Sequence, residues 1–109
     1  MRATMMLPAL LLACASFRAA AGAMQARVGF GDLELESREG RAVLRQRVTE
    51  AAQRYCALYG AEMTPYASRA DPLYCSDMTR TWIVGEMRPA VRKAYFLARR
   101  EAGVKGRAP

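Results

Sequence analysis

The sequence predicts a small, mainly α-helical exported domain, and three observations lead to that prediction. An apolar run follows a positive N-terminus and ends at small residues, as in a secretory leader. Apolar residues recur at spacings of three and four through most of the remaining chain. Two cysteines stand 19 residues apart within the helical region. We therefore expect a signal peptide, one short N-terminal β-strand, and a disulfide-linked helical hairpin whose second helix is kinked or broken.

Residues 1–23 have the three parts of a secretory signal peptide. Arg2 supplies the positive start, residues 6–17 form the apolar run, and Ala21-Gly22-Ala23 is an A-x-A cleavage site. The run is shorter than the roughly 20 apolar residues that a spanning helix needs. Cleavage after Ala23 predicts a mature protein, residues 24–109, in the periplasm or the medium.

Two other interpretations of this leader remain open. The segment could stay uncleaved as an anchor, or Leu11-Leu12-Ala13-Cys14 could act as a lipobox with a lipid on Cys14. Few apolar residues precede Cys14, and Leu12 is bulkier than the residue usual at its position. We therefore interpret Cys14 as one more apolar residue of the leader.

The mature chain is a single small domain, and its two cysteines predict a disulfide. A domain of this size buries only about 60–65% of its unfolded surface, so small exported domains often add a covalent link. Cys56 and Cys75 are an even pair, and a loop of this length is worth about 3 kcal/mol. Metal or redox roles are lesser alternatives, because the chain has no histidine and no C-x-x-C motif.

Residues 26–35 alternate between apolar and other residues and predict the strand, with a bulge or kink at Gly31-Asp32 where the phase changes. Its apolar members are Val28, Phe30, Leu33 and Leu35. No second strand is visible to pair with its backbone, so we expect this strand to meet a protein partner or a second copy. The rival arrangement folds it back over its own helices. Asp32 is expected to bond backbone N–H groups in a turn.

The first helix is predicted over residues 38–59, with Ser37 as its N-cap and Gly60 as its end. After a loop, Asp71-Pro72 should start the second helix, with Cys75, Met78 and Trp82 on its inner face. Pro89 should break this helix, and helical spacing then resumes to residue 102. Residues 103–109 read as a frayed basic tail. The aromatic residues expected mostly in the core are Tyr55, Tyr59, Trp82 and Tyr95.

Several of these residues also form a pattern that resembles a known family. The pattern comprises V-x-F-x-D-L-x-L at 28–35, Ser37-x-x-Gly40, A-A-x-x-x-C at 51–56, a second cysteine, and P-A-V-R-K-A-Y at 89–95. The chain resembles the UrcA family of small exported bacterial proteins over essentially the whole mature region. It departs from that family in a longer loop at 62–71 and at Phe30, where tyrosine is frequent. The resemblance implies export and this architecture, and it implies no reaction.

The residue types present argue against catalysis and favour binding. Histidine is absent, and no nucleophile, paired carboxylate or phosphate-binding loop forms a recognisable motif, so we expect no enzyme, cofactor or metal site. Removing Arg2 and Arg18 from the 17 basic residues leaves 15 against 10 acidic residues, a net charge of +5. The excess gathers after Met87, in Arg88, Arg92, Lys93, Arg99 and Arg100.

Two functions follow as expectations. The first is a non-enzymatic interaction protein of the bacterial envelope, bound to a protein partner or to itself through the strand. The alternative is an anion-binding or membrane-surface-binding module that uses the basic C-terminal helix. Export argues against nucleic acid as the partner.

Overall fold

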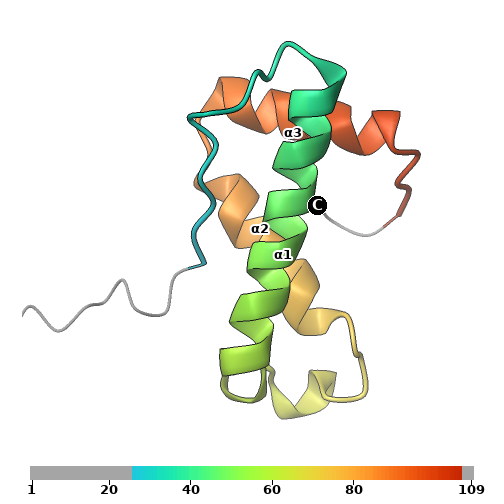
Figure 1. Ribbon diagram of the computed structural model, residues 1–109. Helices are drawn as coiled ribbons and strands as arrows, with labels where there is room; N and C mark the ends of the chain where they lie inside the picture. Colours follow the sequence, from blue (N-terminus) through green and yellow to red (C-terminus); the bar gives the residue numbers. More distant parts are fainter. Residues whose placement is uncertain (1–25, 107–109) are drawn as a thin grey trace, which may run out of the picture.

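The computed structural model describes residues 26–106, and this part of the chain consists of helices joined by short loops (Figure 1). The elements in order are α1 (Arg38–Met63), the 3-10 helix η1 (Tyr66–Ser68), α2 (Tyr74–Gly85) and α3 (Pro89–Glu101). The long α1 lies at the centre, α2 packs along it, and α3 crosses near its N-terminal end. The predicted signal peptide, including Cys14, and the last three residues of the tail lie outside the described residues.

Helix α1 begins where the sequence predicts and ends later than predicted. The Ser37 side chain accepts a hydrogen bond from the Gly40 N–H at 2.9 Å, as an N-cap should. The expected end at Gly60 is wrong, because the helix continues to Met63. Pro65 sets the end instead, since a residue before proline avoids the helical conformation, and Thr64 is extended at φ −90° and ψ 113°.

Helices α2 and α3 are separated by the predicted break at Pro89, which becomes the first residue of α3. The predicted start of α2 at Asp71-Pro72 is early, because α2 begins at Tyr74. The Asp71 carboxylate accepts the Leu73 N–H at 3.0 Å, and this forms a turn before the helix. Helix α3 ends in a Schellman motif, with Gly103 at φ +69° and the Val104 N–H donating to the Arg99 carbonyl.

Residues 26–36 form an extended segment, here called the strap, and not the predicted strand. No β-strand occurs within residues 26–106. The Leu33 N–H donates to the Phe30 carbonyl at 3.0 Å, so the predicted kink at Gly31-Asp32 is a β-turn. The side chains that pack against the helical core are Ala26, Val28, Phe30, Leu33 and Leu35. The strap therefore folds back over its own helices (Figure 1).

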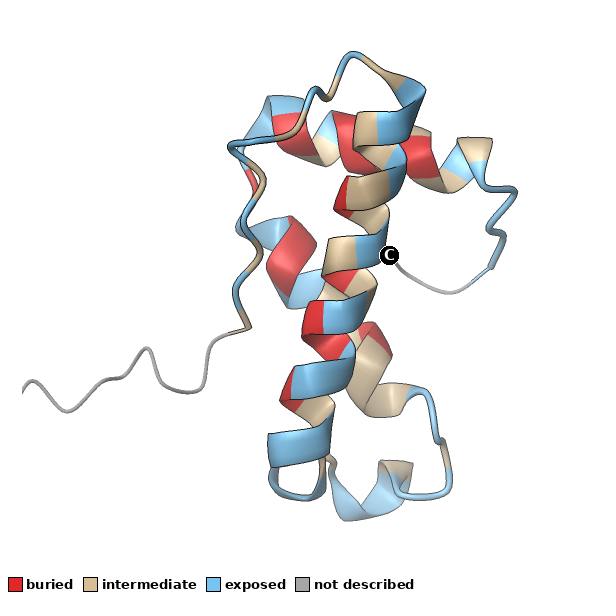
Figure 2. Ribbon diagram, viewed as in Figure 1, coloured by how far each residue is buried: buried red, intermediate tan, exposed pale blue. Residues whose placement is uncertain are grey.

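The core lies between the three helices, where their buried positions face one another (Figure 2). Helix α1 contributes Leu44, Val48, Ala51 and Ala52, and the other helices contribute Ile83, Val84, Met87, Val91, Ala94 and Tyr95.

The prediction that Trp82 lies in the core is wrong. Its side chain is 49% exposed, whereas the fully buried Thr79 lies on the inner face of α2. The disulfide fixes which face of α2 turns inward, so the inner stripe follows Cys75 in steps of four to Thr79 and Ile83. Because the Thr79 side chain is polar, the pattern of apolar residues did not identify this stripe as the inner face of α2.

Candidate functional site

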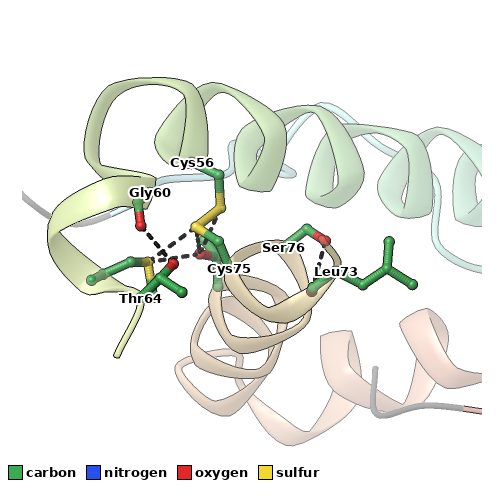
Figure 3. The surroundings of a disulfide bond; sticks show 8 residues. Cys56, Gly60, Thr64, Leu73, Cys75 and Ser76 are labelled. Carbon is green, nitrogen blue, oxygen red and sulfur yellow. Dashed lines mark hydrogen bonds between the residues drawn. A yellow bond between two sulfur atoms is a disulfide. The ribbon is translucent and has the colours of Figure 1, made fainter. Parts of the chain in front are cut away.

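The predicted disulfide is present and joins the last turns of α1 to the first turn of α2 (Figure 3). Cys56 and Cys75 have Cα atoms 5.9 Å apart, and both residues are half-buried. The Thr79 hydroxyl lies 3.5 Å from the Cys56 sulfur. Because disulfide sulfurs carry no hydrogen, Thr79 is the donor in this contact. The Cys56–Cys75 disulfide links α1 to α2 and so clamps the hairpin.

A third sulfur completes this region. The Met63 thioether lies 3.2 Å from the Cys75 sulfur, whereas the sequence had drawn attention to Met78. A cavity of about 660 Å³ opens beside the disulfide, and its lining includes Gly60, Thr64 and Arg69. Within residues 26–106, no three His, Cys, Asp or Glu side chains gather as they would around a metal ion.

Two arginines of α1 hold the strap. Arg47 binds both carboxylate oxygens of Asp32, at 2.7 and 2.8 Å, and also donates to the Gly29 carbonyl at 2.9 Å. These hydrogen bonds from Arg47, together with one from the Asp32 backbone, lower the pKa of Asp32 to about 2. The predicted structural role of Asp32 in a turn is therefore extended by an ion pair.

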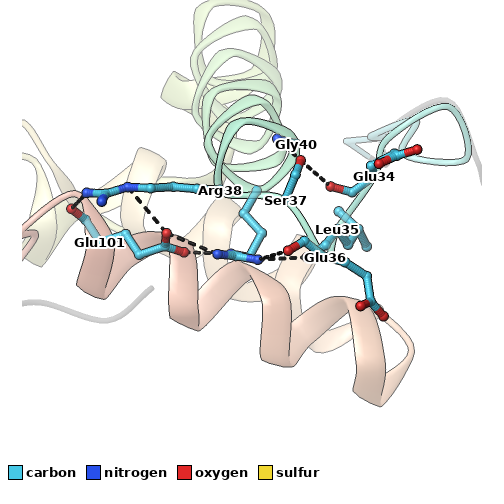
Figure 4. Close-up of polar contacts among 8 residues, drawn as sticks. Glu34, Leu35, Glu36, Ser37, Arg38, Gly40 and Glu101 are labelled. Carbon is cyan, nitrogen blue, oxygen red and sulfur yellow. Dashed lines mark hydrogen bonds and ion pairs between the residues drawn. The ribbon is translucent and has the colours of Figure 1, made fainter.

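Arg41 of α1 binds both the strap and α3, and Figure 4 labels its partners Leu35, Glu36 and Glu101. It donates to both carboxylate oxygens of Glu101 on α3, at 2.6 and 3.1 Å. It also donates to the carbonyls of Leu35 and Glu36, at 3.1 and 2.8 Å. The hydrogen bond from Arg41 is the main reason that the pKa of Glu101 is lowered. Arg38 adds a second contact to the same carboxylate at 3.4 Å.

Five carbonyl groups of the strap, those of residues 29, 30, 34, 35 and 36, thus accept hydrogen bonds within the molecule. Besides the arginine-bound carbonyls and Phe30, the Glu34 carbonyl accepts from the Ser37 backbone at 3.2 Å and from its hydroxyl at 2.9 Å. The predicted association of this segment with a partner assumed that only another strand could donate hydrogen bonds to its carbonyls. Val28, Phe30, Leu33 and Leu35, which were predicted to meet a partner, are partly buried against the core of their own chain.

The close passage of the strap over α1 requires a glycine. A Cβ atom at Gly40 would lie 1.9 Å from the Glu34 carbonyl oxygen, which no side chain can tolerate. Ser37, Gly40, Asp32 and the two cysteines, which carry much of the family resemblance, all therefore have structural roles in this chain.

The five basic residues singled out in and before α3 do not form one surface. Arg92 points inward and donates to the carbonyls of Val84, Gly85 and Met87, at 3.1, 2.9 and 2.9 Å. It therefore caps the end of α2. Arg88 lies over the Phe30 ring, 5.8 Å from its centroid. Lys93 and Arg100 are exposed, and Arg99 borders a cavity at the junction of the helices.

A feature that sequence reasoning missed is a partly exposed group of large apolar side chains on α1 and α2. We call it the aromatic surface, and it consists of Leu58, Tyr59 and Trp82 together with the buried Tyr55 beneath them. The ring of Tyr55 lies 5.0 Å from that of Tyr59 and 6.3 Å from that of Trp82, measured between centroids. Leu58 is 73% exposed, and Trp82 is about half exposed. The sequence predicts Tyr55, Tyr59 and Trp82 in the core, whereas the structure buries Tyr55 and leaves Trp82 about half exposed.

Two shallow grooves flank the start of the strap beside the aromatic surface. The first, of about 240 Å³, lies against Tyr55, Leu58 and Tyr59 and is bordered by Arg27 and Arg54. The second, of about 250 Å³, shares Ala26 and Arg27 with the first; its other lining residues are Val28, Phe30, Ile83, Glu86 and Met87.

No family model, no curated protein and no solved structure matches this chain. Among the helices of residues 26–106, none combines the length and apolarity needed to cross a bilayer. The function must therefore be argued from the surfaces described above.

Proposed function

We propose that this protein is an exported, non-enzymatic interaction protein that binds a partner protein through the aromatic surface. The observation that carries the proposal is the exposure of Leu58 and Trp82 beside two tyrosines on a disulfide-clamped hairpin. Tryptophan and tyrosine are enriched at the energetic centres of protein interfaces. The clamp supports the role, because a rigid surface loses little conformational freedom on binding.

The residues around the first groove indicate the chemistry of the partner. Arg27 and Arg54 border the apolar groove that Tyr55, Leu58 and Tyr59 line. A complementary segment would place an apolar side chain in the groove and carboxylates beside the two guanidinium groups. The partner is therefore an acidic protein segment with an apolar anchor.

Export is part of the proposal and has two supports besides the leader sequence. A disulfide persists in oxidising compartments and is rare in the cytoplasm. The resemblance to the UrcA family points to the same compartment. The scattered basic residues give less support to the alternative, a C-terminal helix bound to an anionic surface.

Association through the strap stays a prediction, and it has a direct measurement. Strand addition would have to break the bonds that Arg41 and Arg47 make to the strap's carbonyls. Analytical ultracentrifugation of the mature protein would detect a dimer, and Phe30→Pro would abolish one built on this segment. A monomer at all concentrations would leave the aromatic surface as the binding face.

The aromatic surface can be tested with a matched pair of substitutions. A photo-crosslinking residue at position 58 should capture the partner in the intact envelope, and the same residue at position 66 should not. Tyr66 is a suitable control because it is 85% exposed and lies on η1, outside the aromatic surface.

The captured partner then allows affinities to be measured. Leu58→Glu should weaken binding about tenfold or more, because it places a charge in an apolar groove, whereas Tyr66→Glu should leave affinity unchanged. Trp82 is the only tryptophan, so its emission should shift to shorter wavelength on binding. Equal effects of the two substitutions would refute the proposed surface.

A further inference from the structure

The Cys56–Cys75 disulfide forms part of the wall of an open cavity. Both cysteines line this cavity of about 660 Å³, and both are half-buried rather than enclosed in the core. The volume lies within the roughly 300–1,000 Å³ that is typical of sites for small molecules. Accessible disulfides are commonly the labile or regulatory ones, whereas enclosed ones resist exchange. The bond therefore lies where a small molecule can approach it.

Gly60 leaves this side of the disulfide uncovered (Figure 3). It lies in the last turns of α1, and a Cβ atom there would stand 3.7 Å from the Cys75 sulfur and 3.8 Å from the Cys56 Cβ. These are ordinary contacts, and among the described glycines only Gly103 and Gly106 have a positive φ. Neither crowding nor the backbone therefore requires glycine at position 60, although glycine weakens a helix relative to alanine. What the glycine does provide is open space in front of the disulfide.

The two sulfur atoms of the disulfide differ as leaving groups. Cys75 lies in the first turn of α2, where backbone N–H groups without helical partners stabilise a thiolate. Cys56 lies inside α1, where the N–H groups are already paired. The Met63 thioether also lies 3.2 Å from the Cys75 sulfur and covers one side of it. Because the more stable thiolate leaves faster, an incoming thiolate should attack Cys56 and release Cys75.

We propose that this cavity admits a low-molecular-weight thiol, which opens the disulfide by exchange. The thiol loses its proton to water, and its sulfur forms a bond to the Cys56 sulfur. The Cys56–Cys75 bond breaks, and its electron pair stays on the Cys75 sulfur as a thiolate. One disulfide replaces another, so the step needs no oxidant or reductant other than the thiol. Attack of the Cys75 thiolate on the mixed disulfide reverses the step and releases the thiol.

This exchange makes the clamp a reversible modification site and leaves the rest of the hairpin packed. Thr79, Ile83 and Val84 stay buried on the inner face of α2 whether or not the two sulfurs are joined. None of the residues of the aromatic surface lines this cavity. The inference therefore goes beyond the proposed partner binding and does not depend on it.

The first test exposes the mature, disulfide-bonded protein to reduced glutathione. Samples taken at early times are quenched with a maleimide at mildly acidic pH, and the peptides are mapped by mass spectrometry. We expect glutathione on Cys56 and maleimide on Cys75. Failure of the folded protein to form a mixed disulfide, or glutathione found chiefly on Cys75, would contradict the proposed step.

A matched pair of substitutions tests the cavity as the route of attack. Gly60→Leu places a side chain in front of the disulfide and should slow glutathione incorporation about tenfold or more, because access limits exchange. Ala57→Leu is the control, since it introduces leucine on α1 at an exposed position outside the cavity, and it should react at the wild-type rate. Equal rates in the two variants would refute the cavity route.

A second measurement separates attack on the folded protein from attack on unfolded chains. Urea below the unfolding transition raises the unfolded population steeply, because the free energy of unfolding falls linearly with its concentration. Attack through the cavity should leave the rate of glutathione incorporation nearly constant over this range in the wild type and in Ala57→Leu. A rate that rises in proportion to the unfolded population would overturn the proposal, because the disulfide would then react only after unfolding.

Discussion

The two ends of α1 are held to the rest of the molecule by different chemistry. At the N-terminal end, Arg41 and Arg47 bind carboxylates and carbonyls of the strap and α3. At the C-terminal end, the Cys56–Cys75 bond joins α1 to α2, with the Met63 sulfur beside it. One end is polar, non-covalent and sensitive to acid, whereas the other is covalent and sensitive to reductants.

This difference follows from where the partners lie in the sequence. The cysteines are 19 residues apart, so their bond closes one loop between neighbouring helices. Arg41 and Glu101 are 60 residues apart, so their ion pair forms only when α3 has packed across α1. The disulfide restricts the unfolded chain, whereas the arginine contacts act only in the folded state. The two ends should therefore fail separately under different conditions.

Removing the disulfide should have the largest effect. Replacing both Cys56 and Cys75 by alanine should lower the free energy of unfolding by about 2–4 kcal/mol and the thermal midpoint by roughly 10–25 °C. Urea denaturation followed by far-ultraviolet circular dichroism measures the change. Wild type treated with a dithiol reductant should show a similar loss. A loss below about 1 kcal/mol would mean that the covalent end contributes little.

A substitution that crowds the strap against the N-terminal end of α1 should have the second-largest effect on stability. Gly40→Ala places a Cβ atom against the Glu34 carbonyl and should cost about 1–3 kcal/mol, despite the better helix propensity of alanine. Hydrogen exchange of the Leu33 N–H should also accelerate, because the strap is displaced. Gly85→Ala is the matched control, since nothing lies within 4 Å of its added carbon. A neutral Gly40→Ala would show that the strap moves freely.

Acid should release the Asp32 contact with the smallest effect on stability. Its pKa is depressed from 3.8 to about 2, so the stabilisation is complete above pH 3.8 and is lost as the pH falls towards 2. Carboxyl titration by NMR should return the pKa of Asp32 towards 3.8 in Arg47→Gln, whereas Lys93→Gln should leave it near 2. If the pKa of Asp32 stays near 2 in Arg47→Gln, the ion pair between Asp32 and Arg47 does not hold the strap.

The local parts of the fold were predictable from the sequence. The Ser37 cap, the disulfide and the break at Pro89 each depend on a residue type and its immediate neighbours. The strap's partner was not predictable, because Arg41 occupies a position that reads as the solvent face of α1. Long arginine side chains reach backbone carbonyls that sequence patterns do not connect to them.

The candidate sites were less predictable than the fold, for two reasons. Trp82 and Tyr59 read as core residues, and only the rotation of α2 set by the disulfide leaves the indole exposed. The cavity at the junction of the helices is lined by residues from all three helices, among them Arg45, Arg80 and Arg99, so no sequence window contains its lining. Arg92 shows the reverse error, since a basic residue that suggested an anion site caps a helix instead.

The position of the exposed loop inside the disulfide ring determines what a protease cut in that loop does to the molecule. Arg69 is exposed and lies between the two cysteines, so a trypsin-like enzyme can reach its peptide bond. Such a cut adds one water molecule but releases no fragment, because the Cys56–Cys75 bond still joins the two pieces. The nicked molecule would keep α1 packed against α2 and α3, and the pieces would separate only when the disulfide is reduced.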